Sequence, residues 1–326
     1  MKLFCNAVFE GGGVKGIGLV GAAEEIVNAG YVFINLAGSS AGAIVAALLA
    51  VGYTPKEIKK EMLATDFTKF KSKPIASRFG LIGDIINVNS NLGLYNANYF
   101  EKWLHDLLVK KGKTSFGDLK NHYVSKNMPA YKLQVTATDV TKKRLLVLPG
   151  DLKEFDIDPD SFSIAKAVRM SMSIPVFYEP YKLYNNNEQA HYIVDGGLIS
   201  NYPVWIIDDG ESRYEYPTFG FKFISNNEHQ QVFDRNIISY SKAIIGLAMD
   251  SNEIEYGHNA SGDKERTIEI PTAVSIDGKK EQINTIDFGI SNEASLALYV
   301  NGKVAAKKFL RNWNFKNWQS QFRPFK

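Results

Sequence analysis

Residues 3–52 alternate between strand-like and helix-like stretches, and this order constrains the fold more than any other feature of the sequence. Residues 3–9 and 31–38 are mostly apolar or rich in β-formers, which is typical of buried strands. Residues 16–28 carry apolar side chains at helical spacing, and residues 40–52 are apolar on nearly every side, which predicts a buried helix. This βαβα order favours a parallel sheet with helices on its faces.

Further stretches along the chain extend this α/β pattern. Four more strands and two long helices are predicted, at 131–140, 144–150, 191–197 and 218–224 and at 97–111 and 294–313 respectively. Since no stretch between them has the composition of a linker, we expect one α/β domain with a parallel or mixed central sheet and helices on both faces. Its main part is expected to span residues 5–207, with residues 208–326 as a C-terminal extension that completes the same globule.

The composition excludes several classes of protein. A net charge of +3 on 326 residues is too small to indicate a nucleic-acid-binding protein. The single cysteine, Cys5, excludes an internal disulfide and a cysteine-built zinc site, and no apolar run reaches the roughly 18 residues of a membrane span. Because the N-terminus reaches Glu10 too soon for a secretory signal, we expect a cytoplasmic protein, with secretion as an effector left open.

The glycine turn after the first strand has two incompatible interpretations. Gly11, Gly13 and Gly16 match the G-x-G-x-x-G spacing of a dinucleotide-binding turn. A dinucleotide needs an acidic residue about 20 residues further on to hold its ribose, yet no Asp or Glu lies between Glu25 and Glu57. The dinucleotide interpretation therefore fails, and a rigid cluster of backbone N–H donors for an oxyanion remains.

A second motif, GSSAG at residues 38–42, stands at the junction between the second strand and the buried helix. G-x-S-x-G at such a junction is typical of a nucleophile elbow, in which a sharp turn exposes the serine Oγ. Ser40 would lie at the helix N-terminus, where the partial positive charge favours an alkoxide-like state. The alternative is a helix start whose glycines serve close packing alone. Because adjacent parallel strands end side by side, the turn at Gly11–Gly13 would lie next to Ser40.

Three ordered motifs together resemble those of the patatin-like phospholipase family: GGGVKG at 11–16, GSSAG at 38–42 and DGG at 195–197. Three further blocks are similar as well: TATD at 136–139, AVRMSMSIPVFYEP at 167–180 and DGGLISNYPV at 195–204. The resemblance covers about residues 5–207 and implies a three-layer fold with a serine nucleophile elbow. Lys15 stands where many members have arginine, a change that keeps the charge but loses the planar guanidinium.

The resemblance also implies a serine–aspartate dyad, in which Ser40 is the nucleophile and Asp195 accepts its proton. A free carboxylate has a pKa of about 4, so burial of Asp195 is needed to make it a useful base. On its own, DGG is also typical of an ordinary turn after a strand. The oxyanion hole implied by the family is Gly11, Gly12 and Gly13. The supporting motif positions are Lys15, Gly16, Gly38, Gly42, Gly196 and Gly197.

A Ser-His-Asp triad is the alternative, and in hydrolase order it would need a histidine downstream of the acid. His229 and His258 lie downstream, but both stand in polar stretches typical of solvated loops. His191 precedes the aspartate by four residues on the same strand, about 13 Å by strand rise, so it cannot bridge serine and aspartate. His105 and His122 precede any candidate acid and are expected on helix surfaces.

The resemblance implies a lipid acyl hydrolase of phospholipase A type that works through an acyl-enzyme, with no metal and no other cofactor. An esterase or thioesterase acting on smaller acyl groups, and a catalytically silent lipid-binding module, are the alternatives. The expected partners are a phospholipid or other acyl-ester substrate and, peripherally, a membrane surface. Nucleic acid is not expected, and the oligomeric state is left open.

Two basic, aromatic stretches are candidates for contact with lipid. Residues 67–83 contain four cations and no acid, which suits a lid or a contact with anionic lipid, and a solvated loop is the alternative. These cations are Lys69, Lys71, Lys73 and Arg78. Residues 311–326 interleave cations with aromatic side chains, which suits interfacial binding, and packing onto the core is the alternative. These aromatic residues are Trp313, Phe315, Trp318, Phe322 and Phe325.

Overall fold

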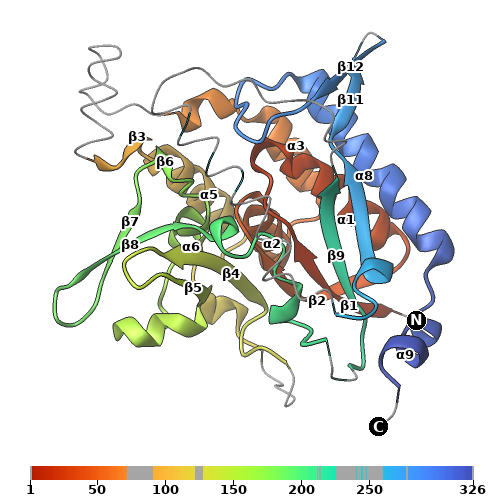
Figure 1. Cartoon of the computed structure of the whole chain (residues 1–326), viewed down its shortest axis with the longest axis horizontal. Coiled ribbons are helices and arrows are strands. Elements are labelled where there is room, and N and C mark those ends of the chain that lie inside the picture. The colour runs from red at the N-terminus through yellow and green to blue at the C-terminus, as the bar shows by residue number, and fades with distance from the viewer. Residues whose placement is uncertain are drawn as a thin grey trace.

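The protein is described here by a computed structural model with a mixed β-sheet at its centre (Figure 1). The described residues are 2–71, 91–121, 128–210, 214–224, 260–276 and 278–324, together with positions 212, 240, 244 and 247. Some residues singled out in the sequence lie outside this set: Lys73, Arg78, His122, His229, His258 and Phe325.

The central sheet is built from eight strands within the described residues. Their bounds are β1 (Leu3–Phe9), β2 (Tyr31–Gly38), β4 (Leu133–Asp139), β5 (Arg144–Leu148), β7 (Tyr181–Tyr184), β8 (Ala190–Asp195), β9 (Thr218–Ile224) and β10 (Thr267–Pro271). The order is β10-β9-β1-β2-β4-β8-β7, and β5 also pairs with β4. The strands from β10 to β4 are parallel, whereas β8, β7 and β5 pair antiparallel. The prediction of a parallel or mixed sheet is therefore confirmed.

The helices predicted from periodicity are present, and the described residues contain further helices that the sequence does not predict. The predicted ones are α1 (Gly16–Asn28), α2 (Ala41–Val51), α5 (Asn98–Lys110) and α8 (Asn292–Asn312). The others are α3 (Pro55–Ala64), α6 (Ile164–Ser171) and α9 (Phe315–Phe322). Two small sheets, β3 (Gly93–Tyr95) with β6 (Val176–Tyr178) and β11 (Ala273–Ile276) with β12 (Lys279–Gln282), are also additional. Within the described ranges, no helix has the length and apolar character that crossing a bilayer requires.

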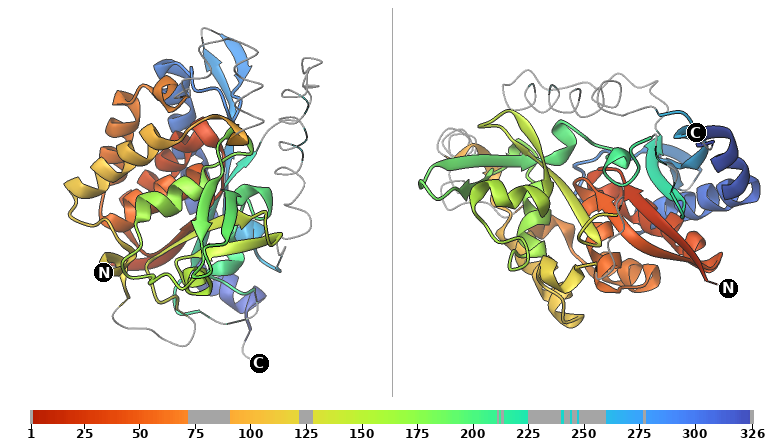
Figure 2. Two further views of the ribbon diagram at one scale, coloured as in Figure 1. Left: turned by 90° about the vertical axis from the view of Figure 1, so that its left-hand side faces the viewer. Right: turned by 90° about the horizontal axis from the view of Figure 1, so that it is seen from below.

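The sheet separates a large core from a small one, and β1 contributes to both by the two-residue alternation of strands. Ala7 and Phe9 face the large core, where α1, α2 and α6 pack on the sheet and α8 packs along α1. Val8 faces the other side, where it meets residues 204 and 207 of the segment after β8. Figure 2 shows the red and orange helices of the first part of the chain gathered on one side of the sheet. The helices on one face, the central sheet and the segment on the other face are the three layers of this α/β fold.

The chain beyond residue 207 contributes to the same sheet, because β9 pairs with β1 and β10 pairs with β9. Its aromatic tail packs inward in the described part: Trp313 stacks on Phe309 and meets Phe219 edge-on, and Trp318 is 7 % exposed. The packing interpretation of the tail therefore describes Trp313 and Trp318. Contact between this tail and a membrane stays a prediction.

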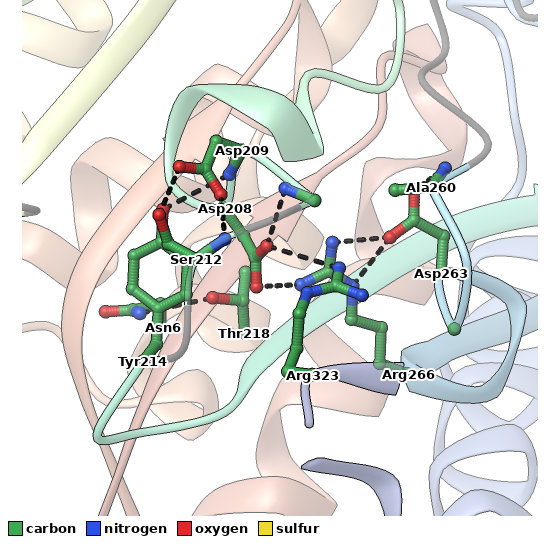
Figure 3. Close-up of polar contacts among 12 residues, drawn as sticks. Asn6, Asp208, Asp209, Ser212, Tyr214, Thr218, Ala260, Asp263, Arg266 and Arg323 are labelled. Carbon is green, nitrogen blue, oxygen red and sulfur yellow. Dashed lines mark hydrogen bonds and ion pairs between the residues drawn. The ribbon is translucent and has the colours of Figure 1, made fainter. Parts of the chain in front are cut away.

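A buried ion cluster holds the start of the C-terminal part against its end (Figure 3). The Arg266 guanidinium pairs with Asp208, and it donates to Asp263 from Nε at 2.9 Å. Arg323, just after α9, lies 3.5 Å from Asp208 and donates to the Ser261 carbonyl at 2.7 Å. Asp208 lies in the segment that follows β8, residues 196–210. The cluster therefore connects that segment to both ends of residues 260–324.

Candidate active site

Ser40 stands between the end of β2 and the start of α2, in a strained backbone conformation. Its φ of 50° and ψ of −123° are unusual for a residue with a side chain and cost about 1–3 kcal/mol. The turn is tight, because a Cβ on Gly42 would collide with the Phe9 carbonyl and a Cβ on Gly38 would collide with the Gly42 backbone. Small residues therefore let the strand and helix meet closely enough to form this elbow.

The two adjacent serines of the elbow have different surroundings. The Ser39 hydroxyl donates to the Ser200 carbonyl at 2.7 Å and shares a 2.5 Å hydrogen bond with the Thr136 hydroxyl, so it is engaged in the scaffold. Ser40 is 1 % exposed, and its hydroxyl contacts the Met172 Sδ at 3.5 Å, a long and weak hydrogen bond. Ser40 is therefore the serine whose hydroxyl is available for chemistry.

Asp195 ends β8 and lies across β4 from the elbow. Gly38 pairs with Val135 of β4, and Asp195 pairs with Ala137 two residues further along the same strand. The carboxylate is held at one oxygen, where Oδ1 accepts from the Gly197 amide at 2.8 Å. The backbone between Asp195 and Gly197 is confined as well, since a Cβ on Gly196 would collide with Thr136 of β4.

Burial makes Asp195 a much stronger base than an exposed aspartate. The side chain is 0 % exposed, and this desolvation raises its pKa to about 7, against opposing hydrogen bonds from the Gly197 amide and the Ser40 hydroxyl. The hydroxyl lies near enough to Asp195 to lower that pKa. Even so, Oδ2 has no partner with well-formed hydrogen-bond geometry among the described residues. Catalytic hydrogen bonds often tighten only when substrate binds.

Residues 171–173, at the end of α6, connect the serine and the aspartate. The Ser171 hydroxyl accepts from the Ser40 amide at 2.8 Å, Met172 contacts the Ser40 hydroxyl, and the Ser173 carbonyl accepts from the Asp195 amide at 2.9 Å. These residues lie in the block at 167–180 that resembles the patatin-like phospholipase family, but the sequence alone predicts no role for any of them. No local pattern marks them, because their function depends on contacts more than 20 residues away along the chain.

The glycine turn lies beside Ser40, as the parallel pairing of β1 and β2 predicts. A Cβ on Gly11 would come within 3.1 Å of the Ser40 Cβ. The Gly11 amide is engaged, since it donates to the Asn201 carbonyl at 3.1 Å. Gly13 adopts a φ of +56°, and a Cβ there would collide with the Thr285 carbonyl. In the described part of the chain, no acceptor is found for the amides of Gly12 or Gly13.

Two other motif positions, together with Glu10, support this turn. Gly16 begins α1, and a Cβ on it would approach the Ala41 Cβ to 3.3 Å, so the first turns of α1 and α2 lie side by side. The Lys15 Nζ lies 5.4 Å from the centre of the Phe223 ring, a cation–π contact. Glu10, which the sequence does not single out, is 2 % exposed and accepts from the Phe223 amide. These contacts fix the turn against β9.

An apolar pocket opens beside the elbow between the glycine turn, α2 and α6. It is lined by Gly13, Val14, Gly16, Ala41, Ile44, Met62, Phe67, Phe70, Trp103, Met172 and Phe288. The pocket leaves only about 20 Å³ for the centre of a water-sized molecule, so its side chains nearly fill it. Phe67 and Phe70 belong to the basic stretch considered as a lid, and its described part lines this pocket. The cations Lys69 and Lys71 flank Phe70 in the same segment.

Neither described histidine joins the site. His191 is 1 % exposed and shares a 2.9 Å hydrogen bond with Asp139, and its ring meets Phe155 edge-on. His105 is exposed on α5. Among the described residues, no group of His, Cys, Asp or Glu is arranged to hold a metal ion.

Comparisons with known proteins place this fold and these motifs in one family. A family model for the patatin-like phospholipases matches residues 7–208. The protein YqhO of Bacillus subtilis (strain 168) is 34% identical over 314 residues, which cover 96% of this chain and 100% of YqhO. The "Probable lipid hydrolase 463L" of Invertebrate iridescent virus 6 is 28% identical over 207 residues, which cover 62% of this chain and 63% of that protein.

A solved structure has the same fold. The crystal structure of VipD from Legionella pneumophila superposes with a TM-score of 0.56 at 22% sequence identity. The match covers 94% of this chain and 66% of the VipD chain, so this chain spans about two thirds of that structure. On the family match over most of its length, the chain belongs to the patatin-like phospholipase family.

Proposed function

We propose that the protein is a phospholipase of the A type, which hydrolyses the fatty acyl esters of membrane phospholipids through Ser40 and Asp195. The observation that carries the proposal is a fully buried aspartate with a pKa raised to about 7 beside a serine on a strained elbow. A base with a pKa near the working pH is well matched to accepting a serine proton. The family and the name of the viral relative, a probable lipid hydrolase, support a lipid substrate.

The first half-reaction forms an acyl-enzyme. Ser40 Oγ attacks the ester carbonyl carbon while its proton passes to Asp195 Oδ2, and the carbonyl oxygen becomes an oxyanion. The amides of Gly12 and Gly13 are the donors we assign to that oxyanion, because the Gly11 amide already donates to Asn201. Collapse of the intermediate breaks the ester bond, and Asp195 returns its proton to the departing alkoxide of the lysophospholipid.

The second half-reaction releases the fatty acid. Water takes the place of the leaving alcohol and attacks the acyl carbonyl, with Asp195 accepting the water proton. Collapse of the second oxyanion intermediate returns that proton to Ser40 and frees the fatty acid. The acyl chain would lie in the apolar pocket, whose wall includes Ala41 next to the nucleophile. Such a substrate lies in a membrane surface, so peripheral contact with lipid is part of this proposal.

An esterase acting on short acyl groups is the second candidate, and the small pocket volume favours it. About 20 Å³ holds little more than one water molecule, so a long chain must displace the lining side chains. The two candidates differ in substrate. Vesicles of phosphatidylcholine and phosphatidylglycerol, and a series of soluble 4-nitrophenyl esters, are incubated with the protein and with Ser40→Ala.

Mass spectrometry of released fatty acid distinguishes the candidates. Fatty acid and lysophospholipid from vesicles, absent with Ser40→Ala, support the phospholipase. Hydrolysis of short esters alone supports the esterase. A protein that hydrolyses neither, or a Ser40→Ala variant that retains activity, contradicts the proposal.

A further inference from the structure

The only hydrogen bond formed by the Ser40 hydroxyl with good geometry, within the described residues, is to a methionine rather than to the proposed base. Ser40 Oγ lies 3.5 Å from Met172 Sδ, and Oδ2 of Asp195 has no well-aligned partner. A hydroxyl has a single proton to donate. While that proton points at the sulfur, it does not point at the carboxylate that would remove it. The contact with the sulfur therefore competes with the hydrogen bond from the same hydroxyl to Asp195, which lowers the pKa of that carboxyl.

The same methionine is part of the apolar pocket. Met172 is 3 % exposed, and its side chain lines the pocket together with Gly13 and Ala41. Its backbone is fixed, because its amide donates to the carbonyls of Val168 and Arg169 at the end of α6. The side chain, in contrast, is unbranched and readily changes rotamer. One flexible side chain thus touches both the reacting hydroxyl and the space that an acyl chain must fill.

The pocket leaves little free space while Met172 keeps this position. About 20 Å³ is open to the centre of a water-sized molecule, which is room for little more than one water. Side chains must move to admit substrate, and Met172 is a side chain that both lines the pocket and touches Ser40. A ligand that displaces the Met172 side chain as it enters would also remove the sulfur from the hydroxyl.

We propose that Met172 is a positioning residue that keeps the Ser40 hydroxyl turned away from Asp195 until an acyl chain displaces its thioether from the pocket. This inference rests on the proposed function and adds to it a dependence on chain length. A short ester does not reach into the pocket, so the Ser40 hydroxyl that it meets is still in contact with the sulfur. A long acyl chain releases the hydroxyl as it binds.

The kinetic test replaces the sulfur without changing the volume greatly. Met172→Leu is compared with wild type and with Met170→Leu, a buried methionine of α6 that does not line the pocket. Acylation rate constants are measured for 4-nitrophenyl acetate and 4-nitrophenyl decanoate below micelle-forming concentrations. We expect Met172→Leu to speed acylation by acetate about two- to tenfold, the value of one weak hydrogen bond, and to change decanoate little. Met170→Leu should keep the wild-type ratio of the two rates.

A second measurement needs no turnover, so it separates this inference from the proposed function. Methyl groups of methionine are labelled with ¹³C in wild type and in Ser40→Ala, and sodium decanoate is added to saturation. The Met172 resonance, assigned by its loss in Met172→Leu, should shift in both proteins, while the Met170 resonance should not. An unshifted Met172 resonance overturns the inference even if esters are hydrolysed. An unchanged acetate-to-decanoate ratio in Met172→Leu overturns it as well.

Discussion

The backbone amide of Ser40 donates a hydrogen bond of 2.8 Å to the side-chain hydroxyl of Ser171. This bond is made at the residue with the strained φ of 50°, so it stabilises a conformation that the chain would not adopt by itself. Ser171 is 0 % exposed, so its hydroxyl lies in the interior of the protein. The end of α6 thereby fixes the direction in which the elbow presents its hydroxyl.

Replacing Ser171 by alanine should weaken both the elbow and the activity. The variant leaves the Ser40 amide without its acceptor, which costs about 1–3 kcal/mol of unfolding free energy. Because the nucleophile becomes less well positioned, kcat should fall by about tenfold with little change in KM. Urea unfolding and ester kinetics check both effects. Ser295→Ala, a buried serine on α8, is the control, and an equal loss of kcat there would refute the assignment.

The raised pKa of Asp195 predicts how activity depends on pH. Only the deprotonated carboxylate accepts a proton, so kcat/KM for a soluble ester should rise about tenfold per pH unit in acid and level off near the pKa of about 7. The measurement is kcat/KM between pH 5 and 9. A plateau that extends down to pH 5 would show that the essential base has an ordinary carboxylate pKa.

The same residue predicts an effect on stability with a definite sign. Its pKa is about 7 in the folded protein against 3.8 for an unperturbed aspartate, so the native state binds more protons between these pH values. The contribution of Asp195 to the free energy of unfolding therefore falls as pH rises from 3.8 to about 7. Asp195→Asn does not titrate, and should gain on the order of a few kcal/mol over wild type between pH 5 and 8. A difference that is constant with pH would contradict this burial penalty.

The buried ion cluster should be essential for holding the C-terminal part in place. Arg266→Leu leaves Asp208 and Asp263 buried without their main cation, which should lower the unfolding free energy by about 3–5 kcal/mol. Arg311→Leu, at an exposed position near the end of α8, should change it by less than about 0.5 kcal/mol. Thermal unfolding of both variants tests this. Similar melting temperatures would mean that the cluster does not stabilise the fold.

Much of the fold is predictable because its first elements are defined locally. β1, β2 and α2 are buried along most of their length, so their apolar pattern is continuous and their ends fall at glycines. β10 is not foreseen, since only Ile268 and Ile270 are buried and the strand is completed by pairing with β9. The prediction of a strand through residue 197 is too long, because the Asp195 side chain accepts from Gly197 and turns the chain.

The candidate site is only partly predictable for a related reason. Ser40, Asp195 and the glycine turn each carry a short motif that is visible in the sequence. Met172 and Ser171 carry none, since their importance comes from contacts with a residue about 130 positions away. The pocket likewise joins Met62, Trp103 and Phe288 from separate elements. The engagement of the Gly11 amide by Asn201 is a further tertiary effect, and it moves the proposed oxyanion donors to Gly12 and Gly13.

The most direct test of the dyad is the site and rate of labelling by a fluorophosphonate, measured by intact mass and peptide mapping across pH 5 to 9. The account predicts a single adduct on Ser40, formed at a rate that rises with pH to a plateau near 7 and falls by orders of magnitude in Asp195→Asn. An adduct on Ser39 or elsewhere, or equal labelling of Asp195→Asn, would contradict it.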